Sequence, residues 1–301
     1  MTALATLARS LEVHGEVRRD EPLWRHTTFG VGGPADVHLI VHDAEGLAAA
    51  VRAARDADVP SFVLGSGSNI VVADAGIRGL VIDNRARTEI EEGAHRFLVE
   101  SGVSFAAFAR KMCRRGIAGL AWAAGIPGTI GGAVVYNAGA YGGCLGDVLT
   151  RVRLTTPVGT DRWHEAAEMN LVYRGSVLRE RPGEVVLEAE LALHPGVPGE
   201  LMEQVAEFDR RRLAAQPRGR NAGSMFKNPP EHPAWKLIDE VGMRGQRRGD
   251  AGISEQHSNF FVNHGSARAA DIDWLATEAE RRVREQFGIE LQREVGFVGA
   301  W

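Results

Sequence analysis

The sequence predicts an α+β protein with more than one domain. The chain has 301 residues, enough for two or three domains, and its 44% hydrophobic and 25% charged residues are typical of a folded globular protein. In the first third, strand patterns alternate with helix patterns, and from Leu149 to His194 the pattern is strand-like. The proline- and glycine-rich Pro195–Gly199 is the clearest linker, so we expect a separate C-terminal domain after it.

The spacing of apolar residues places the elements before this linker. Residues 35–41 alternate apolar and polar positions and then become apolar, which predicts a strand. Asp43 is a good N-cap for the helix that follows. The apolar face of that helix comprises Leu47, Ala50, Val51 and Ala54. Further strands are expected at residues 62–64, 80–82, 96–100, 152–154, 171–173 and 185–193, with a helix at residues 105–115.

Two helices are expected after the linker. Leu201, Val205 and Phe208 mark the first. In the last helix of the chain, we expect Asp271 to cap the start and Gly288 to end it. The expected apolar face comprises Trp274, Leu275, Val283 and Phe287, and the expected ion pairs are Glu278–Arg282 and Glu280–Arg284.

Composition and charge exclude several classes of function. A net charge of −4 argues against a general nucleic-acid binder, and no apolar run approaches the length of a membrane span. The N-terminus lacks the basic start and long apolar stretch of a signal peptide. Cys113 and Cys144 have no partner motif, and the histidines have no metal-ligand spacing. We therefore expect a cytoplasmic protein without a metal site, a nucleic-acid partner or a membrane partner.

Residues 125–143 carry seven glycines and hardly a charge. Each glycine can adopt positive φ or allow another group to approach the backbone closely. A simple turn needs only one or two glycines, so this stretch indicates backbone wrapped around a large, flat or phosphorylated ligand. The alternative is a glycine-rich core loop with tight packing.

A second loop of small residues, Leu64–Asn69, directly follows a predicted strand. Its sequence, Leu-Gly-Ser-Gly-Ser-Asn, would allow N–H groups and hydroxyls to reach a pyrophosphate. It is not the dinucleotide-binding fingerprint, which needs a third glycine and a following helix, and it lacks the lysine of a P-loop. Alone it could be a plain turn, but together with residues 125–143 it indicates a shared phosphate-bearing ligand.

Several polar residues have both a functional and a structural interpretation. Ser224 could be a nucleophile, a proton donor, a ligand contact or a structural residue, and the lack of a Gly-x-Ser-x-Gly pattern argues against acyl transfer. Arg210–Arg212 would normally be a solvated helix face, but in an acidic chain it could bind a diphosphate. His257 precedes a predicted strand and could equally contact a ligand or make a structural hydrogen bond.

Eight segments follow one another in a characteristic order. They are residues 27–36 (Thr-Thr-Phe-Gly-Val-Gly-Gly-Pro-Ala-Asp), 64–69, 125–132, 137–142, 173–176, 222–229, 254–263 and 291–295. Together, from about Thr27 to Gly299, they resemble the UDP-N-acetylenolpyruvoylglucosamine reductase family, which makes UDP-N-acetylmuramate for peptidoglycan. One such segment is only suggestive, but eight in the right order are highly specific.

The resemblance implies a two-subdomain FAD-binding fold of the vanillyl-alcohol-oxidase type and a C-terminal α/β substrate-binding domain. It places the FAD-binding subdomains at residues 1–80 and 81–196 and the substrate-binding domain at residues 200–301. The family holds FAD non-covalently. The residues that match its FAD-binding segments are Gly65, Ser66, Gly67, Ser68, Asn69, Gly125, Ile126, Pro127, Gly128, Thr129, Gly131, Gly132, Asn137, Gly139, Ala140, Tyr141 and Gly142.

The resemblance also implies a mechanism. In this family NADPH reduces FAD, and hydride then passes to C3 of the enolpyruvyl group of a nucleotide-sugar substrate. Ser224 matches the proton donor to C2, while Arg174 and Glu294 match the residues that stabilise the intermediate. The expected substrate contacts are Tyr173, Arg212, Lys227, Asn228 and His257, with Arg210 or Arg211 as alternatives to Arg212.

The chain resembles the shorter subtype of the family. Some members carry an insertion with a tyrosine that closes over the substrate, but here no tyrosine lies between Arg174 and Ser224. The sequence leaves open which group closes the nucleotide end of the site. It also leaves the oligomeric state open, and a monomer is compatible with it.

Two other functions remain as alternatives. The first is an oxidase or dehydrogenase of the same fold that acts on another alcohol or sugar. Such enzymes usually attach FAD through a histidine or cysteine near the glycine-rich loops, where Cys144 is the only thiol. The second is a catalytically silent nucleotide-binding protein, which predicts the loss of Arg174, Ser224 or Glu294. All three residues are present.

Overall fold

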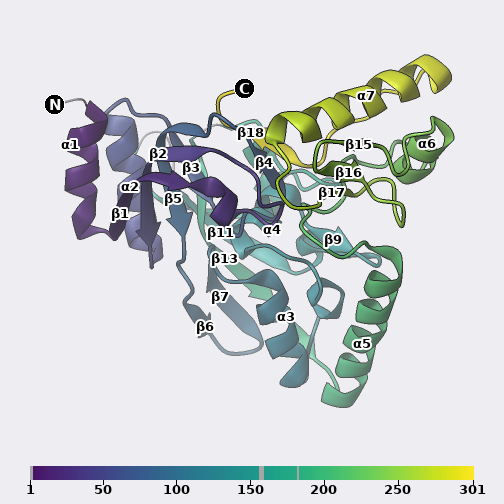
Figure 1. Ribbon diagram of the computed structural model, residues 1–301. Helices are drawn as coiled ribbons and strands as arrows, with labels where there is room; N and C mark the ends of the chain where they lie inside the picture. The colour runs from purple at the N-terminus through teal and green to yellow at the C-terminus, as the bar shows by residue number, and fades with distance from the viewer. Residues whose placement is uncertain (1–2, 156–158, 182) are drawn as a thin grey trace. The chain divides into compact units, whose positions relative to one another are not determined.

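The chain folds into two compact units. The computed structural model describes residues 3–155, 159–181 and 183–301. Residues 1–2, 156–158 and 182 lie outside the described residues. They fall in the first two predicted domains. The first unit comprises Met1–Arg19, Asp36–Ser66 and Gly79–Arg211. The second unit comprises Asp20–Ala35, Gly67–Arg78 and Arg212–Trp301. Figure 1 shows the elements along the chain.

A four-stranded sheet with the order β1-β2-β5-β3 lies mostly in the first unit. Its strands are β1 (Glu16–Pro22), β2 (Pro34–Val41), β5 (Ile77–Asn84) and β3 (Ser61–Leu64). β3 and β5 run parallel. Helices α1 (Ala3–Ser10) and α2 (Ala44–Asp56) share a buried apolar cluster with this sheet. As predicted, Asp43 caps α2, because its carboxylate accepts a hydrogen bond from the Gly46 N–H at 2.7 Å.

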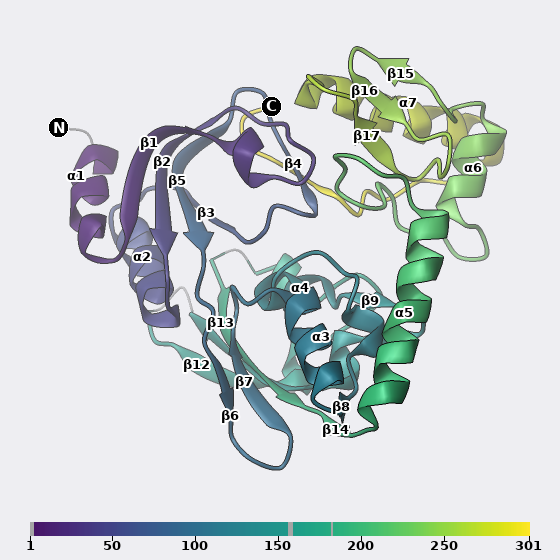
Figure 2. The same cartoon turned by 60° about the horizontal axis from the view of Figure 1, so that its bottom comes forward.

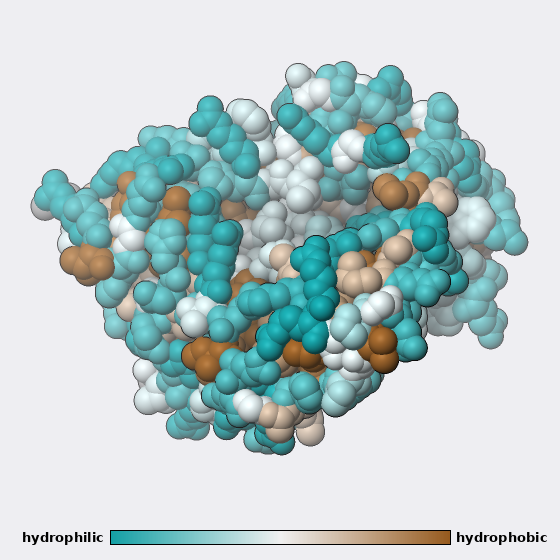
Figure 3. Space-filling view, turned by 90° about the horizontal axis from the view of Figure 1, so that it is seen from below, coloured by the Kyte–Doolittle hydropathy of each residue, from teal (hydrophilic) through white to brown (hydrophobic). Residues whose placement is uncertain are grey.

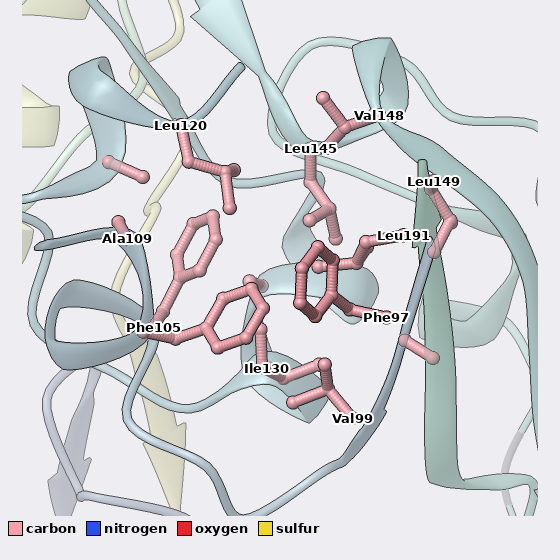
Figure 4. Packing of buried hydrophobic residues seen from close by; sticks show 14 of the residues in the cluster. Phe97, Val99, Phe105, Ala109, Leu120, Ile130, Leu145, Val148, Leu149 and Leu191 are labelled. Carbon is pink, nitrogen blue, oxygen red and sulfur yellow. The ribbon is translucent and has the colours of Figure 1, made fainter. Parts of the chain in front are cut away.

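A five-stranded antiparallel sheet with the order β12-β11-β13-β7-β6 forms the other half of the first unit. Its strands are β12 (Arg162–Glu165), β11 (Leu149–Thr155), β13 (Val185–Ala192), β7 (Arg96–Glu100) and β6 (Glu89–Glu91). Helix α4 (Ile130–Tyr136) lies against β13 (Figure 2). Figure 4 shows the core between this sheet, α4 and α3 (Phe105–Arg114), in which Phe97 and Phe105 are buried.

Shorter elements complete the first unit. Two small antiparallel pairs join β8 (Ile117–Ala118) to β14 (His194–Pro195) and β9 (Gly139–Ala140) to β10 (Gly143–Cys144). Helix α5 (Pro198–Ala215) follows, with Leu201 and Val205 buried as its spacing predicts. The 3₁₀ helices of both units are η1 (Leu11–Val13), η2 (Leu23–His26), η3 (Ala121–Ala123), η4 (Leu145–Asp147), η5 (Ala166–Met169) and η6 (Val177–Arg179).

The second unit contains two small sheets of its own and two complete α-helices. β15 (Arg247–Arg248), β16 (Ala251–Ile253) and β17 (Phe261–Asn263) form an antiparallel sheet, and β4 (Ile70–Val72) runs parallel to β18 (Gly296–Val298). The helices are α6 (Ala234–Glu240) and α7 (Ala269–Phe287). Phe226, Phe261 and Leu275 belong to one buried cluster, so the unit has a core of its own.

The predicted strand at residues 171–173 is wrong. Val172 and Gly175 form a single antiparallel bridge, and two backbone hydrogen bonds of 3.0 and 3.2 Å between them close a turn over Tyr173 and Arg174. Three residues are too few for apolar spacing to distinguish a strand from a turn.

The predicted start of the last helix is also wrong. α7 begins at Ala269, and the carboxylate of Asp74 accepts hydrogen bonds from the N–H groups of Ala269 and Ala270 at 2.9 and 3.1 Å. Asp271 instead lies in the first turn and accepts a hydrogen bond from Arg248 at 3.2 Å. A cap supplied by a residue so distant in sequence leaves no local pattern.

The solvent face of α7 confirms one expected ion pair and corrects the other. Glu278 binds Arg282 at 2.7 Å, but Glu280 binds Arg293 at 2.6 Å in place of Arg284. Trp274 is 43% exposed, and the Arg248 guanidinium lies 4.5 Å from the centre of its ring. Trp274 therefore belongs to the surface and not to the predicted apolar face.

The molecular surface is mainly polar on the side shown in Figure 3, where hydrophobic residues form only small separate patches. Among the described residues, no helix combines the length and the apolar character that a membrane span needs.

Candidate active site

The two predicted ligand loops contact each other within the first unit. Gly65 follows the end of β3, and a Cβ atom on Gly65 would lie 2.7 Å from Oγ1 of Thr129. Thr129 is the N-cap of α4, and its hydroxyl accepts a hydrogen bond from the Gly132 N–H at 3.5 Å. Only glycine at position 65 allows this approach, which places β3 and the glycine-rich segment side by side.

Several glycines of residues 125–143 are required by the fold itself. Added Cβ atoms would lie 3.0 Å from Ser101 at Gly131 and 2.4 Å from Trp122 at Gly143. Tyr141 and Gly142, with φ of 53° and 88°, form the two-residue turn between β9 and β10, as a type I′ turn requires. The packing alternative therefore holds for these positions. Gly128 has a φ of 142°, so its backbone also requires glycine. Gly132 still indicates a ligand, together with the loop of residues 125–129 as a whole, because an added Cβ on Gly132 would meet no atom nearer than 3.8 Å.

Arg174 lies in a turn that is anchored to the end of α4. The Asn137 amide donates to the Val172 carbonyl at 3.1 Å, and the Ser176 hydroxyl donates to the Val135 carbonyl at 2.8 Å. Asn137 also accepts a hydrogen bond from the Gly146 N–H at 3.0 Å. Its side chain is thus used to hold the turn, which places Arg174 beside the glycine-rich segment.

The side chain of Arg174 packs on its neighbour. Its guanidinium lies 5.3 Å from the ring centre of Tyr173, which is 58% exposed. The Arg174 carbonyl accepts a hydrogen bond from Arg179 at 3.3 Å. The turn therefore carries an exposed aromatic ring beside a half-buried guanidinium.

Ser224 and Glu294 lie on adjacent segments of the second unit. Ser224 forms an antiparallel bridge with Phe260 on one side of its segment, and Phe226 forms one with Arg293 on the other. The Glu294 N–H donates to the Met225 carbonyl at 2.8 Å. Two residues that are far apart in the sequence are thus joined through Met225.

Three residues of the predicted FAD loop, Gly67, Ser68 and Asn69, belong to the second unit. The Asn69 amide donates to the Glu294 carbonyl at 3.1 Å, and the Asn69 carbonyl accepts from the Gly296 N–H at 2.9 Å. A Cβ atom on Gly67 would lie 2.1 Å from the His26 carbonyl oxygen. Gly67 is therefore needed for packing, and the side chain of Asn69 positions the backbone of Glu294.

The remaining predicted substrate residues are distributed over three segments. Lys227 lies on the Ser224 segment, and its N–H donates to the Gln292 carbonyl at 2.8 Å. The side chain of Asn228 accepts a hydrogen bond from the Ala234 N–H at 3.0 Å and so caps α6. Arg212 is half-buried near the end of α5.

His257 is held as a neutral ring. Its ring centre lies 5.0 Å from that of Phe260 and 6.2 Å from that of Trp235. Nδ1 lies 3.3 Å from the Asn259 N–H, which donates to it. Burial lowers the pKa of His257 from its ordinary 6.5, and the nearby Arg244 adds to this effect. The ring is therefore uncharged at neutral pH and can form hydrogen bonds with a ligand in that state.

Two side-chain amides hold these segments. Asn137, a predicted cofactor contact, anchors the Arg174 turn with its side chain. Asn259, which the sequence did not single out, bonds the backbone of Phe226. An asparagine among the apolar residues of a predicted strand, as in Asn259-Phe-Phe-Val262, is the signal that could have found it.

Two family models and several named relatives match this chain. The family model described as "UDP-N-acetylenolpyruvoylglucosamine reductase, C-terminal domain" matches residues 215–298, and the one described as "FAD binding domain" matches residues 35–163. The UDP-N-acetylenolpyruvoylglucosamine reductase of Geobacter metallireducens is 40% identical over 290 residues, which cover 96% of both chains. That of Gloeobacter violaceus is 45% identical over 279 residues, 91% of this chain and 93% of the relative.

A solved structure extends the similarity to three dimensions. The crystal structure of UDP-N-acetylenolpyruvylglucosamine reductase from Thermus caldophilus matches with a TM-score of 0.79 and 36% identity, covering 94% of this chain and 98% of that one. The predicted α+β class, with an FAD-binding fold followed by a C-terminal domain, is confirmed. The chain belongs to the UDP-N-acetylenolpyruvoylglucosamine reductase family.

Proposed function

We propose that this chain is an NADPH-dependent flavoenzyme that reduces UDP-N-acetylglucosamine enolpyruvate to UDP-N-acetylmuramate. Similarity over nearly the whole length of named reductases supports the reaction class. The structural observation that carries the proposal is the hydrogen bond between the Glu294 N–H and the Met225 carbonyl. It joins the segments of the two residues, Ser224 and Glu294, that are expected to act on one substrate.

The first unit fits a non-covalently bound FAD. An added Cβ on Gly65 would lie 2.7 Å from Oγ1 of Thr129, so this glycine lets the two loops meet, whereas at Gly132 an added Cβ would meet no atom nearer than 3.8 Å, which leaves space beside the backbone there. We assign the hydroxyls of Ser66 and Thr129 to the diphosphate. Residues 125–129 and Gly132 would lie along the cofactor, and the backbone of residues 137–142 would continue this wall. When bound, FAD would supply the hydride transfer from NADPH to C3 of the enolpyruvyl group.

Three side chains supply the remaining chemistry. Addition of hydride at C3 leaves negative charge on the carboxylate and a need for a proton at C2. We assign the proton to Ser224 Oγ, the countercharge to Arg174 and a hydrogen bond to the intermediate to Glu294. Serine is a weak acid, so Lys227, on the same segment as Ser224, is assigned to lower the cost of proton release.

Further residues are assigned to bind the substrate. We assign the substrate diphosphate to Arg212, the position that matches the family's basic residue. Arg210 and Arg211, which both bind Glu207 at 2.7 Å, are the alternatives. Tyr173, Asn228 and His257 are proposed as further contacts, and residues 200–301 as the substrate-binding domain after FAD-binding subdomains at residues 1–80 and 81–196.

Purified protein tests the function directly. We expect a flavin absorbance spectrum and NADPH oxidation that depends on UDP-N-acetylglucosamine enolpyruvate. A colourless protein that cannot be reconstituted with FAD would contradict the proposal. Oxygen consumption with alcohols or sugars, without reduction of the enolpyruvyl substrate, would establish the alternative oxidase.

A further inference from the structure

A side-chain amide holds the segment that carries Ser224. The Phe226 N–H donates to Oδ1 of Asn259 at 2.9 Å, and Nδ2 of Asn259 donates to the Phe226 carbonyl at 2.8 Å. Both residues are buried, with exposed fractions of 1% for Phe226 and 3% for Asn259. The amide of Asn259 therefore pairs with Phe226 as a backbone peptide group would.

This pairing lies where the ladder between two segments ends. Ser224 forms a bridge with Phe260, and the Met225 N–H donates to the backbone carbonyl of Asn259 at 2.7 Å. After Phe226 the segment pairs on its other side, where the Lys227 N–H donates to the Gln292 carbonyl at 2.8 Å. Without the amide, both backbone groups of Phe226 would be buried and would lose these partners.

We propose that Asn259 is a positioning residue for the proton-donating step, because its amide fixes the backbone of Phe226, two residues after Ser224 and directly after Met225, whose carbonyl binds the Glu294 N–H. This inference rests on the proposed function. Asn259 itself touches no reacting atom in this account. Its effect comes from geometry, since a displacement of about 1 Å at a reacting group can slow a step by about 100-fold.

Asn263 provides a matched control in the same unit. It is also a buried asparagine, 5% exposed, and its Nδ2 donates to the carbonyls of Phe29 and Gly30 at 3.0 and 3.2 Å. Its Oδ1 accepts hydrogen bonds from Gly265 and Ala267. These four bonds all go to residues outside 224–227 and 292–294. Asn263 is thus the same residue type as Asn259 and is similarly buried, but it binds a different segment.

The test compares Asn259→Asp with Asn263→Asp. Aspartate keeps the size and the acceptor but loses the donor. Asn259→Asp therefore loses the hydrogen bond to the Phe226 carbonyl, and Asn263→Asp loses those to the Phe29 and Gly30 carbonyls. The two half-reactions are followed separately by rapid mixing of the FAD-loaded protein. In Asn259→Asp we expect flavin reoxidation by substrate to slow by about 100-fold, while reduction by NADPH stays within a few-fold of wild type.

Two further readouts separate positioning from general stability. We expect the solvent deuterium isotope effect on reoxidation to increase in Asn259→Asp, because proton transfer becomes slower, and not in Asn263→Asp. Hydrogen exchange of the peptide containing Phe226 should be faster in Asn259→Asp without any cofactor. In Asn263→Asp both half-reactions should stay within a few-fold of wild type.

The inference is overturned if Asn259→Asp slows both half-reactions equally, or if it leaves reoxidation at the wild-type rate. Should Asn259→Asp fail to fold, Asn259→Ser takes its place in the test, because the smaller serine hydroxyl cannot bridge both backbone groups of Phe226. Reoxidation at the wild-type rate in Asn259→Ser would likewise overturn the inference. If the wild-type flavin is not reoxidised by the substrate at all, the proposed function fails, and the inference fails with it.

Discussion

Arg174 adopts a backbone conformation that most residues avoid. Its φ is 55°, in the left-handed region, and it occupies the third position of the turn between Val172 and Gly175. Glycine is the usual residue at such a position, because a Cβ atom makes this conformation about 1–2 kcal/mol less favourable. The chain thus keeps a charged side chain where stability alone would favour glycine, which is typical of functional sites.

Replacing Arg174 by glycine and by alanine tests this strain. Both variants lack the guanidinium, so we expect both to lose substrate-dependent reoxidation of the flavin. Only glycine relieves the strain, so Arg174→Gly should be more stable than Arg174→Ala by about 1 kcal/mol. Urea denaturation measures the difference, and equal midpoints would show that the turn is not strained.

His257 makes stability depend on pH. Burial lowers the pKa of its folded form below 6.5, so between the two pKa values the unfolded chain binds more protons. The contribution of the neutral ring to stability is therefore complete above about pH 7.5 and is lost as pH falls from the unfolded pKa through the lowered folded pKa. We expect stability measured against His257→Gln to decline over this range. An imidazole that titrates at or above 6.5 by NMR would contradict the prediction.

The helices and strands with strong local signals were predicted, and those that depend on distant residues were not. Asp43 and α2 followed from the cap and the apolar spacing, whereas the start of α7 depends on Asp74. Residues 171–173 form a turn because Asn137 and Ser176 anchor both sides of it to α4. The sequence of residues 171–173 contains no pattern that indicates these hydrogen bonds.

The role of Asp74 as the N-terminal cap of α7 can be tested by mutation. Asp74→Ala removes both hydrogen bonds to the first turn of α7, so it should lower the free energy of unfolding by about 1 kcal/mol. Asp271→Ala, which removes the cap expected from the sequence, should cost less, because Asp271 makes a surface ion pair with Arg248. Thermal denaturation of both variants compares them. A larger loss for Asp271→Ala would mean that Asp74 is not the cap.

At the scale of the whole molecule, each unit is assembled from separate stretches of sequence. Residues 67–78 belong to the second unit, where β4 pairs with β18 near the C-terminus. Their loop begins in the first unit, with Gly65 beside Thr129. The motifs and their order could be read from the sequence. The pairings that place Asn69 beside Glu294, and Glu294 beside the Ser224 segment, are non-local and could not.

Ser224 is proposed to donate the proton that completes reduction of an enolpyruvyl nucleotide sugar. The most direct measurement is rapid-mixing analysis of Ser224→Ala, with Ser266→Ala, an exposed serine of the same unit, as the control. We predict that NADPH still reduces the flavin in both variants. Reoxidation by UDP-N-acetylglucosamine enolpyruvate should slow by about 10²–10⁴-fold in Ser224→Ala and stay at the wild-type rate in Ser266→Ala. Reoxidation of Ser224→Ala within a few-fold of wild type would contradict the account.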